Sequence, residues 1–182
     1  GNHQYWNRYV DSRKLLPLSC AVDNAYFQQN QFTTKDTFLL KTSLGIRPNH
    51  LIFIMVGKLE RRKRCLEFIK GLALSKSKSE VTLLLVGDGD LKSEVLETAA
   101  EFEVNVVITG FIEPKNIPLY YNLADYGVSI ASYDPSPKTL NEGLNFDLPY
   151  IVAGPTEIGT VNDLIKEGVN GLIWDSSKPF TY

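Results

Sequence analysis

Six short apolar runs, separated by segments of helical periodicity, restrict what this chain can fold into more than any other feature. Each run is four to seven residues long, and most are apolar at every position instead of at every second one. Continuous apolar runs are typical of parallel strands whose two faces are both covered by helices. The runs are Leu51–Gly57, Val81–Gly87, Val104–Gly110, Tyr126–Ala131, Pro149–Ala153 and Gly171–Trp174.

The segments between these runs carry apolar residues three and four positions apart, which indicates amphipathic helices. Gly168 is expected to end the last of them. This alternation predicts a doubly wound, Rossmann-like α/β domain with a six-stranded, mostly parallel sheet flanked by helices. The apolar stripes are Leu66, Ile69, Leu72 and Ala73; Leu91, Val95, Ala99 and Phe102; Ile117, Tyr120, Tyr121 and Ala124; and Val161, Leu164 and Ile165.

The first 50 residues lack this alternation. Residues 1–16 are predicted to be a flanking or interdomain segment, and Pro17–Phe27 an extended segment that enters a turn. Residues 28–37 are rich in Gln, Asn and Thr and are predicted to form a loop, and Thr37–Leu44 a short helix that ends at Gly45. The predicted domain therefore spans residues 17–175, with residues 176–182 as a tail.

Composition excludes several classes of protein. The formal net charge is −2 and the pI about 5.7, whereas nucleic-acid-binding modules carry a basic excess, so no nucleic-acid partner is expected. The sequence has no apolar run of about 18 residues and no signal-peptide pattern, so a cytoplasmic location is expected. Cys20 and Cys65 fit free thiols in a reducing compartment, and neither they nor His3 and His50 stand in a metal-ligand spacing.

Ligands of open parallel sheets bind outside the carboxyl ends of the strands, so the loops after the strands are the candidate site. The loop Gly57–Arg64 carries five cations within seven residues and leads into a helix, which favours a phosphate site; a solvated run of charges is the alternative. In Gly87–Asp90 the glycines permit a tight turn and Asp90 can cap the next helix, and capping alone explains this loop. Backbone groups at Phe111 and Ile112 could contact a base, although a tight turn also explains them.

The loop after the fourth strand is the most informative. Ser136 and Pro137 suit a helix N-cap and first helical residue, which would leave the N–H groups of Lys138 and Thr139 free for an anion. Asp134 and Glu142 flank this turn eight residues apart. A carboxylate at the position of Glu142 can accept paired hydrogen bonds from vicinal hydroxyls, as in ribose recognition. Spacing alone favours the alternative that both are ordinary turn and surface acids.

Taken in order, these segments resemble the C-terminal, donor-binding domain of GT-B glycosyltransferases, in particular the large retaining family four. Six motifs of that family occur in the family's order over about residues 16–175, and the order makes the resemblance specific. The resemblance implies that the domain is one half of a GT-B fold. The matching segments are Leu16–Phe27 (lpvGVDxxxF), Gly57–Lys63 (GRLxxxKG), Val86–Leu91 (VGDGPL), Gly110–Asp125 (GxIxxxxIPxYYxxAD), Glu142–Ile151 (EAMAxGLPVI) and Glu167–Leu172 (DGxNGxL).

The resemblance also implies roles. Lys58 and Lys63 correspond to the cations that hold the donor diphosphate, with Lys58 where the family usually has Arg. Glu142 corresponds to the acid that binds the ribose hydroxyls, and Asp134 to the acid that contacts the donor sugar near the reacting carbon. The turn at Pro137, Lys138 and Thr139 corresponds to the segment whose backbone binds the β-phosphate, and the remaining donor-binding positions are Gly57, Gly87, Gly89, Phe111 and Ile112.

The implied reaction transfers a sugar from a UDP- or GDP-linked donor to an acceptor hydroxyl with retention, in polysaccharide or glycoconjugate synthesis. Cations and helix N-termini stabilise the diphosphate leaving group, so no metal is expected. The implied partners are an N-terminal acceptor-binding domain, a glycan or lipid-linked acceptor, and a membrane surface contacted through that other domain. The isolated domain is expected to be inactive.

Besides Lys58, four positions depart from the family pattern. Asp134 replaces the usual Glu, and Arg64, Pro137 and Asp147 stand where the family prefers Gly. A catalytically degenerate nucleotide-sugar-binding module therefore stays as one alternative. A nucleotide-sugar epimerase is a second alternative, because such enzymes share the two-domain architecture. A flavodoxin-like interaction domain would explain the strand–helix alternation but not the ordered motifs.

Overall fold

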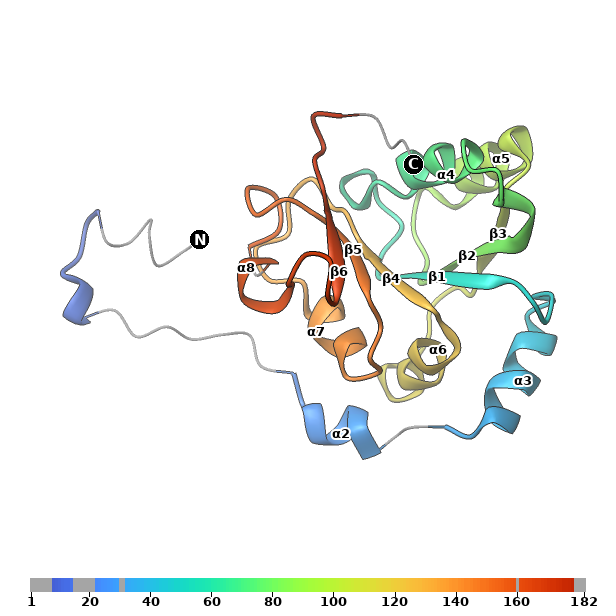
Figure 1. Ribbon diagram of the computed structural model, residues 1–182, viewed down its shortest axis with the longest axis horizontal. Helices are drawn as coiled ribbons and strands as arrows, with labels where there is room; N and C mark the ends of the chain where they lie inside the picture. Colours follow the sequence, from blue (N-terminus) through green and yellow to red (C-terminus); the bar gives the residue numbers. More distant parts are fainter. Residues whose placement is uncertain (1–7, 15–21, 30–31, 160, 179–182) are drawn as a thin grey trace.

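The computed structural model describes residues 8–14, 22–29, 32–159 and 161–178 of the protein. Its centre is a six-stranded sheet with the order β3-β2-β1-β4-β5-β6, in which every neighbouring pair is parallel (Figure 1). The predicted doubly wound α/β fold is confirmed, and each of the six apolar runs contains one strand. The strands are β1 Leu51–Val56, β2 Val81–Val86, β3 Asn105–Ile108, β4 Tyr126–Ser129, β5 Tyr150–Ala153 and β6 Gly171–Trp174.

Helices lie on both sides of this sheet. In Figure 1, α4 and α5 lie above the strands, whereas α6 and α7 lie below them. The six residues of β2 are all buried, because this strand lies inside the sheet and its side chains point into the helical layers. The helices are α2 Asn24–Gln29, α3 Thr34–Ser43, α4 Cys65–Ala73, α5 Lys92–Phe102, α6 Ile117–Leu123, α7 Lys138–Leu144 and α8 Val161–Leu164, with short 3₁₀ turns at Ser12–Lys14, Arg61–Lys63, Lys78–Glu80 and Pro114–Asn116.

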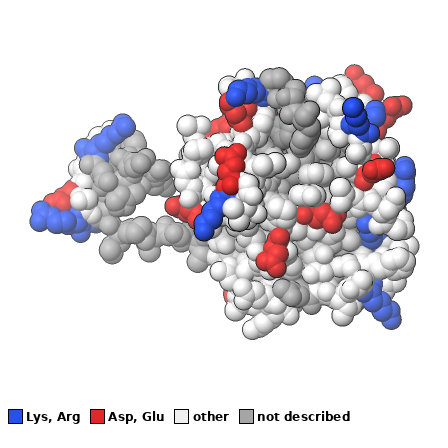
Figure 2. All heavy atoms as spheres, in the orientation of Figure 1, with Lys and Arg blue, Asp and Glu red and all other residues white. Residues whose placement is uncertain are grey.

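The surface over these layers is mixed in charge. Figure 2 shows basic and acidic side chains of the described residues interspersed on one face of the molecule. Among the described residues, no helix is both long enough and apolar enough to cross a bilayer.

Two predictions for the N-terminal region are wrong. Residues 24–27 belong to α2 and not to an extended segment, and α3 begins at Thr34, inside the predicted loop. A capping box causes the early start of α3. The Thr33 side chain accepts from the Asp36 N–H at 3.3 Å, and the Asp36 carboxylate accepts from the Thr33 N–H at 3.0 Å. Residues 1–7 and 15–16 of the predicted flanking segment, 17–21 of the predicted extended segment and 179–182 of the predicted tail lie outside the described residues.

The last helix also ends earlier than predicted. α8 stops at Leu164 instead of near Gly168. The Asn170 amide donates to the Leu164 carbonyl at 3.0 Å and accepts from the Lys166 N–H at 2.7 Å. These side-chain bonds replace the helical ones, so α8 ends before Gly168, and this glycine instead lies in the turn that leads into β6, with φ 75°.

Tyr150 of β5 fixes how α7 packs on the sheet. Its ring is buried beneath Gly127 of β4 and Gly143 of α7, and a Cβ at either glycine would overlap that ring. Its hydroxyl donates to the Thr139 carbonyl in the first turn of α7 at 2.8 Å. The helix that carries Glu142 is therefore held at close range to the sheet by one aromatic side chain.

We expect Gly127→Ala to lower the free energy of unfolding by about 1–3 kcal/mol, because the added methyl group overlaps a buried ring in a packed core. Gly154→Ala is the matched control: a Cβ there meets no atom within 4 Å, and its effect should stay within about 0.5 kcal/mol. Urea unfolding followed by circular dichroism measures both variants. Equal stability of the two would contradict this account of the packing.

Candidate functional site at the carboxyl edge of the sheet

The sheet reverses its strand order between β1 and β4. The chain leaves these two neighbouring strands toward opposite faces, so the loops after β1 and β4 separate and leave a crevice at the carboxyl edge. The first loop runs through residues 57–64, and the second through residues 130–137. These are two of the loops to which the sequence assigns candidate residues.

Lys63 and Asp134 meet across this crevice, although they are 71 positions apart in the sequence. The Lys63 ammonium donates to an Asp134 carboxylate oxygen at 2.9 Å, and only 20% and 14% of the two side chains are exposed. A guanidinium nitrogen of Arg62 lies 3.7 Å from the same oxygen. The two loops are also joined through backbone, because the Ser132 N–H donates to the Arg62 carbonyl at 2.7 Å.

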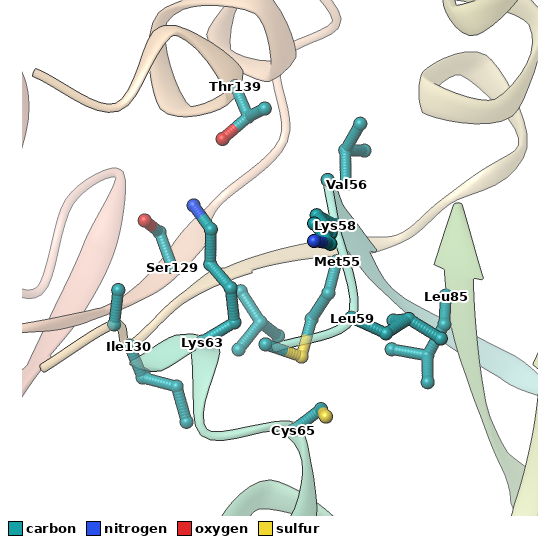
Figure 3. A pocket seen from close by; sticks show the side chains of 13 residues that line it. Met55, Val56, Lys58, Leu59, Lys63, Cys65, Leu85, Ser129, Ile130 and Thr139 are labelled. Carbon is teal, nitrogen blue, oxygen red and sulfur yellow. The ribbon is translucent and has the colours of Figure 1, made fainter. Parts of the chain in front are cut away.

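A pocket beside this ion pair brings further predicted residues together. Gly57, Lys58, Lys63 and Thr139 all line it, and Figure 3 shows the Lys63 ammonium reaching toward the side of the pocket that carries Thr139. Cations from the first loop and the start of α7 therefore face one space. Lys58 lies 3.9 Å from Asp90, but both side chains are largely exposed, so this pair is weak and leaves Lys58 available to a ligand.

Gly57, Gly87 and Gly89 serve the packing of two loops. Gly57 and Gly87 have φ values of 132° and 151°, and a Cβ at Gly87 would overlap the Gly57 carbonyl. A Cβ at Gly89 would overlap the Leu59 backbone, whose N–H donates to the Asp88 carbonyl at 3.0 Å. Only glycine allows the loops after β1 and β2 to lie backbone against backbone.

Asp90 does not cap α5, contrary to the prediction. The N-cap residue is Leu91, without a side-chain hydrogen bond, and the Asp90 side chain is 95% exposed. The reason is the same loop packing: the Leu91 N–H donates to the Leu59 carbonyl at 3.4 Å, and the Lys92 N–H to the Gly89 carbonyl at 3.1 Å. These bonds turn the Asp90 carboxylate away from the helix.

Glu142 lies within α7, as predicted, and neighbouring side chains set the environment of its carboxylate. One carboxylate oxygen accepts from the Tyr121 hydroxyl at 2.9 Å, which leaves the other for a ligand. Burial raises the pKa of Glu142, while the Tyr121 hydrogen bond and the charge of Lys138 lower it in part. Tyr121 is fully buried, and burial raises its pKa well above the usual value, so its hydroxyl keeps its proton.

Tyr121 and Tyr150 are supporting residues that the sequence analysis missed. Tyr121 belongs to a predicted apolar stripe, but Tyr120 lies on the same stripe, so periodicity cannot tell which hydroxyl turns inward. Asp125 was matched to a motif without a role, and the structure gives it one. Its carboxylate accepts from the Ile52 N–H at 2.8 Å and fixes the start of β4 beside β1.

The start of α7 differs from the prediction. Pro137 is the N-cap, with no side-chain hydrogen bond, and the helix begins at Lys138, so Ser136 is not the cap. The Ser136 N–H instead donates to the Asp134 carboxylate at 3.4 Å, and this hydrogen bond closes the turn before α7. Pro137 has no N–H, but the N–H groups of Lys138 and Thr139 lie in the first helical turn, where the helix provides no acceptor.

Two departures from the family's glycines fall at left-handed positions. Arg64 has φ 56° and Asp147 φ 54°, a region that favours glycine. The family's preference for Gly therefore has a backbone cause at both sites, and this chain keeps the conformation with other side chains.

Phe111 and Ile112 follow β3, at the edge of the sheet and away from the Lys63–Asp134 pair. The Phe111 side chain is 79% exposed, whereas Ile112 packs against the core. Phe111 thus offers a free aromatic ring, and Ile112 offers backbone only. Within the described residues, no group of three or more His, Cys, Asp and Glu side chains is placed to hold a metal ion.

Comparison with known proteins identifies the family. The model of the family "Glycosyl transferases group 1" matches residues 36–180. This chain belongs to the group 1 glycosyl transferases. Its curated relatives in that family include an alpha-monoglucosyldiacylglycerol synthase of Streptococcus pneumoniae, which is 24% identical over 89% of this chain. Another is a GDP-mannose-dependent alpha-mannosyltransferase of Corynebacterium glutamicum, which is 27% identical over 94% of this chain. The chain spans only 36% and 35% of those two proteins.

Solved structures of similar fold include a glycosyltransferase from Rickettsia africae, with a TM-score of 0.80 and 20% identity over 98% of this chain and 48% of that one. Anabaena HepE in complex with UDP-glucose gives a TM-score of 0.79 and 18% identity, also over 98% of this chain and 48% of that one. At these identities the likeness establishes the fold, and it agrees with the group 1 assignment.

The raised pKa of Glu142 predicts a pH-dependent stability. The folded carboxyl binds its proton more tightly than the unfolded one, so it favours folding at acid pH and this contribution is lost as the pH rises through the folded pKa. Glu142→Gln removes the buried charge, so we expect a higher thermal midpoint than the wild type at pH 8 and a difference that shrinks toward pH 4. Differential scanning calorimetry across this range measures it. The exposed Glu97→Gln should show no such trend, and a pH-independent difference for Glu142→Gln would refute the argument.

Proposed function

We propose that this chain is the donor-binding half of a glycosyltransferase, which binds a UDP- or GDP-linked sugar for transfer to an acceptor hydroxyl with retention. The observation that carries the proposal is the meeting of Lys63 and Asp134 at the β1/β4 switch point, beside the first turn of the helix that carries Glu142. A cation, a helix start and two acids at this edge match the charge pattern of a nucleotide diphosphate joined to a sugar. Membership of the group 1 family supports the same reading.

Different residues would bind different parts of the donor. Lys63 and Lys58 would hold the diphosphate, together with the N–H groups of Lys138 and Thr139. Their charge would stabilise the diphosphate as it departs, without a metal ion. The free carboxylate oxygen of Glu142 would accept from the ribose hydroxyls, and Asp134 would lie at the sugar.

Donor binding would exchange partners at Lys63. Without a ligand its ammonium neutralises Asp134 at 2.9 Å. A diphosphate carries more charge than a carboxylate, so it would draw the ammonium toward itself and free an Asp134 oxygen for a sugar hydroxyl. Arg62, at 3.7 Å, would then remain as a cation beside the Asp134 carboxylate.

The acceptor would bind mainly to a further domain, because the chain spans about a third of the length of the relatives named above. We therefore propose that the isolated chain binds donor without transferring sugar. A glycan or lipid-linked acceptor, a role in glycoconjugate synthesis, and a cytoplasmic location with membrane contact through that other domain belong to the same proposal.

The alternatives are weaker. A degenerate module would be expected to lose the backbone of the donor loops, yet Arg64 and Asp147 retain the left-handed conformations. An epimerase would need additional acid–base groups in the crevice beyond Asp134 and Glu142, and the family match favours transfer.

The proposal predicts that a saturating nucleotide sugar raises the thermal midpoint by about 5–10 °C, the effect of ligand at about 100 times Kd on a domain of this size. UDP-glucose and GDP-mannose are the first probes, because HepE, of similar fold, was solved in complex with UDP-glucose, and one similar protein is named as GDP-mannose-dependent. Differential scanning fluorimetry of the wild type measures the shift. No response to a broad panel of nucleotide sugars would count against a donor site.

The same assay tests individual residues. Lys63→Ala should weaken nucleotide-sugar binding about tenfold or more, because the diphosphate would lose its contact with a partly buried ammonium group. Lys70→Ala removes the same charge from an exposed position of α4 and is the matched control. Glu142→Ala should abolish the shift. If Lys63→Ala and Lys70→Ala bind alike, or if Glu142→Ala responds like the wild type, the assigned roles are wrong.

A further inference from the structure

Arg64 forms contacts with residues far away in the sequence, which the sequence alone does not predict. It is the left-handed residue between the 3₁₀ turn Arg61–Lys63 and α4, a conformation that costs a non-glycine residue about 1–2 kcal/mol. A costly backbone position persists where surrounding contacts over-determine it, and such positions gather at functional sites. The side chain of Arg64 supplies those contacts.

The Arg64 guanidinium joins two other parts of the crevice. One of its nitrogens lies 2.6 Å from the Glu157 carboxylate, and the two side chains are only 21% and 14% exposed. Its central carbon lies 5.5 Å from the centre of the Trp174 ring, in a cation–π contact. Arg64 thereby ties the loop after β1 to the loop after β5 and to the end of β6.

Glu157 in turn holds Asp134 through backbone. The Asp134 N–H donates to the Glu157 carbonyl at 2.8 Å, and the Gly159 N–H donates to the Asp134 carbonyl at 3.0 Å. A Cβ at Gly159 would overlap the Pro135 carbonyl, so the two loops lie backbone against backbone. The position of Asp134 is therefore set by the loop that Arg64 anchors.

We propose that Arg64 is a positioning residue, which acts through Glu157 to hold the Asp134 carboxylate where the donor sugar binds. This inference rests on the proposed donor site and goes beyond it, since neither Arg64 nor Glu157 contacts the donor in that proposal. A glycine at position 64 would allow the left-handed backbone but could not form an ion pair. Arg64 adopts the same backbone conformation and also fixes the loop through its ion pair with Glu157. The consequence is specific: Arg64 governs recognition of the sugar and not of the nucleotide.

The test compares affinities for a nucleotide sugar and its bare nucleotide. Isothermal titration calorimetry of the wild type with UDP-glucose, UDP, GDP-mannose and GDP first selects the pair that binds. Arg64→Gly keeps the left-handed backbone and removes the ion pair, while Glu157→Gln removes the charge and keeps the backbone carbonyl that holds Asp134. Both should lower the ratio of nucleotide Kd to nucleotide-sugar Kd about tenfold, the value of one charged hydrogen bond, and leave nucleotide affinity within about twofold.

A simple charge effect gives a different result. If Arg64 acts only as a cation near the diphosphate, Arg64→Gly weakens and Glu157→Gln strengthens binding of nucleotide and nucleotide sugar alike, and this pattern would overturn the proposal. The double variant should be no worse than either single variant. Arg61→Gly is the control, because it removes a surface pair with Glu94, 3.0 Å long and largely exposed, from the same loop.

Amide hydrogen exchange separates this proposal from the proposed function. Arg64→Gly and Glu157→Gln should both speed exchange of the Asp134 and Gly159 amides about tenfold, because the loop that holds them opens more often. If the wild type binds none of the four compounds, the proposed donor site fails, and faster exchange still shows that Arg64 holds Asp134. Unchanged exchange in both variants rejects the positioning role, whatever binds.

Discussion

The reversal of strand order between β1 and β4 is the constraint on which the rest of this molecule depends. Two neighbouring parallel strands whose chains leave toward opposite faces cannot close the edge of the sheet between them, so a crevice forms there without any special residue. The charged residues assigned to the diphosphate and the sugar come from the loops on the two sides of that crevice. Lys63 comes from one side of it and Asp134 from the other, and α7 brings Glu142 to the same edge.

The charged groups of the crevice are held at a cost to stability. Burial raises the pKa of Glu142, so its environment disfavours the ionised carboxylate. The fold compensates with hydrogen bonds from buried tyrosines. The Tyr121 hydroxyl donates to the Glu142 carboxylate, and the Tyr150 hydroxyl donates to the Thr139 carbonyl one turn earlier in α7. A functional role explains such charged groups better than a contribution to stability does, because an uncharged residue in the same space would cost less free energy of folding.

Backbone packing, more than side-chain bonding, sets the geometry of the loops. The loops after β1 and β2 touch through Gly57, Gly87 and Gly89, and the loops after β4 and β5 touch through Gly159. The left-handed residue Arg64 shows how a non-glycine can occupy such a place, when an ion pair and a cation–π contact offset the strain. A residue that departs from a family pattern can therefore preserve the backbone and add a connection.

The six strands, the helices from α4 to α7, the fold class and the loops that form the site could be predicted from the sequence, because hydrophobic period and turn glycines are properties of consecutive residues. It misplaced the caps at Asp90 and Ser136, and the start of α3, because caps depend on which backbone groups are already bonded. Three contacts appear only once the chain is folded: Lys63 reaches Asp134, Tyr121 instead of Tyr120 turns inward, and Arg64 pairs with Glu157. These contacts join residues at least 21 positions apart, and their geometry follows from strand order and crossover direction, which no local pattern encodes.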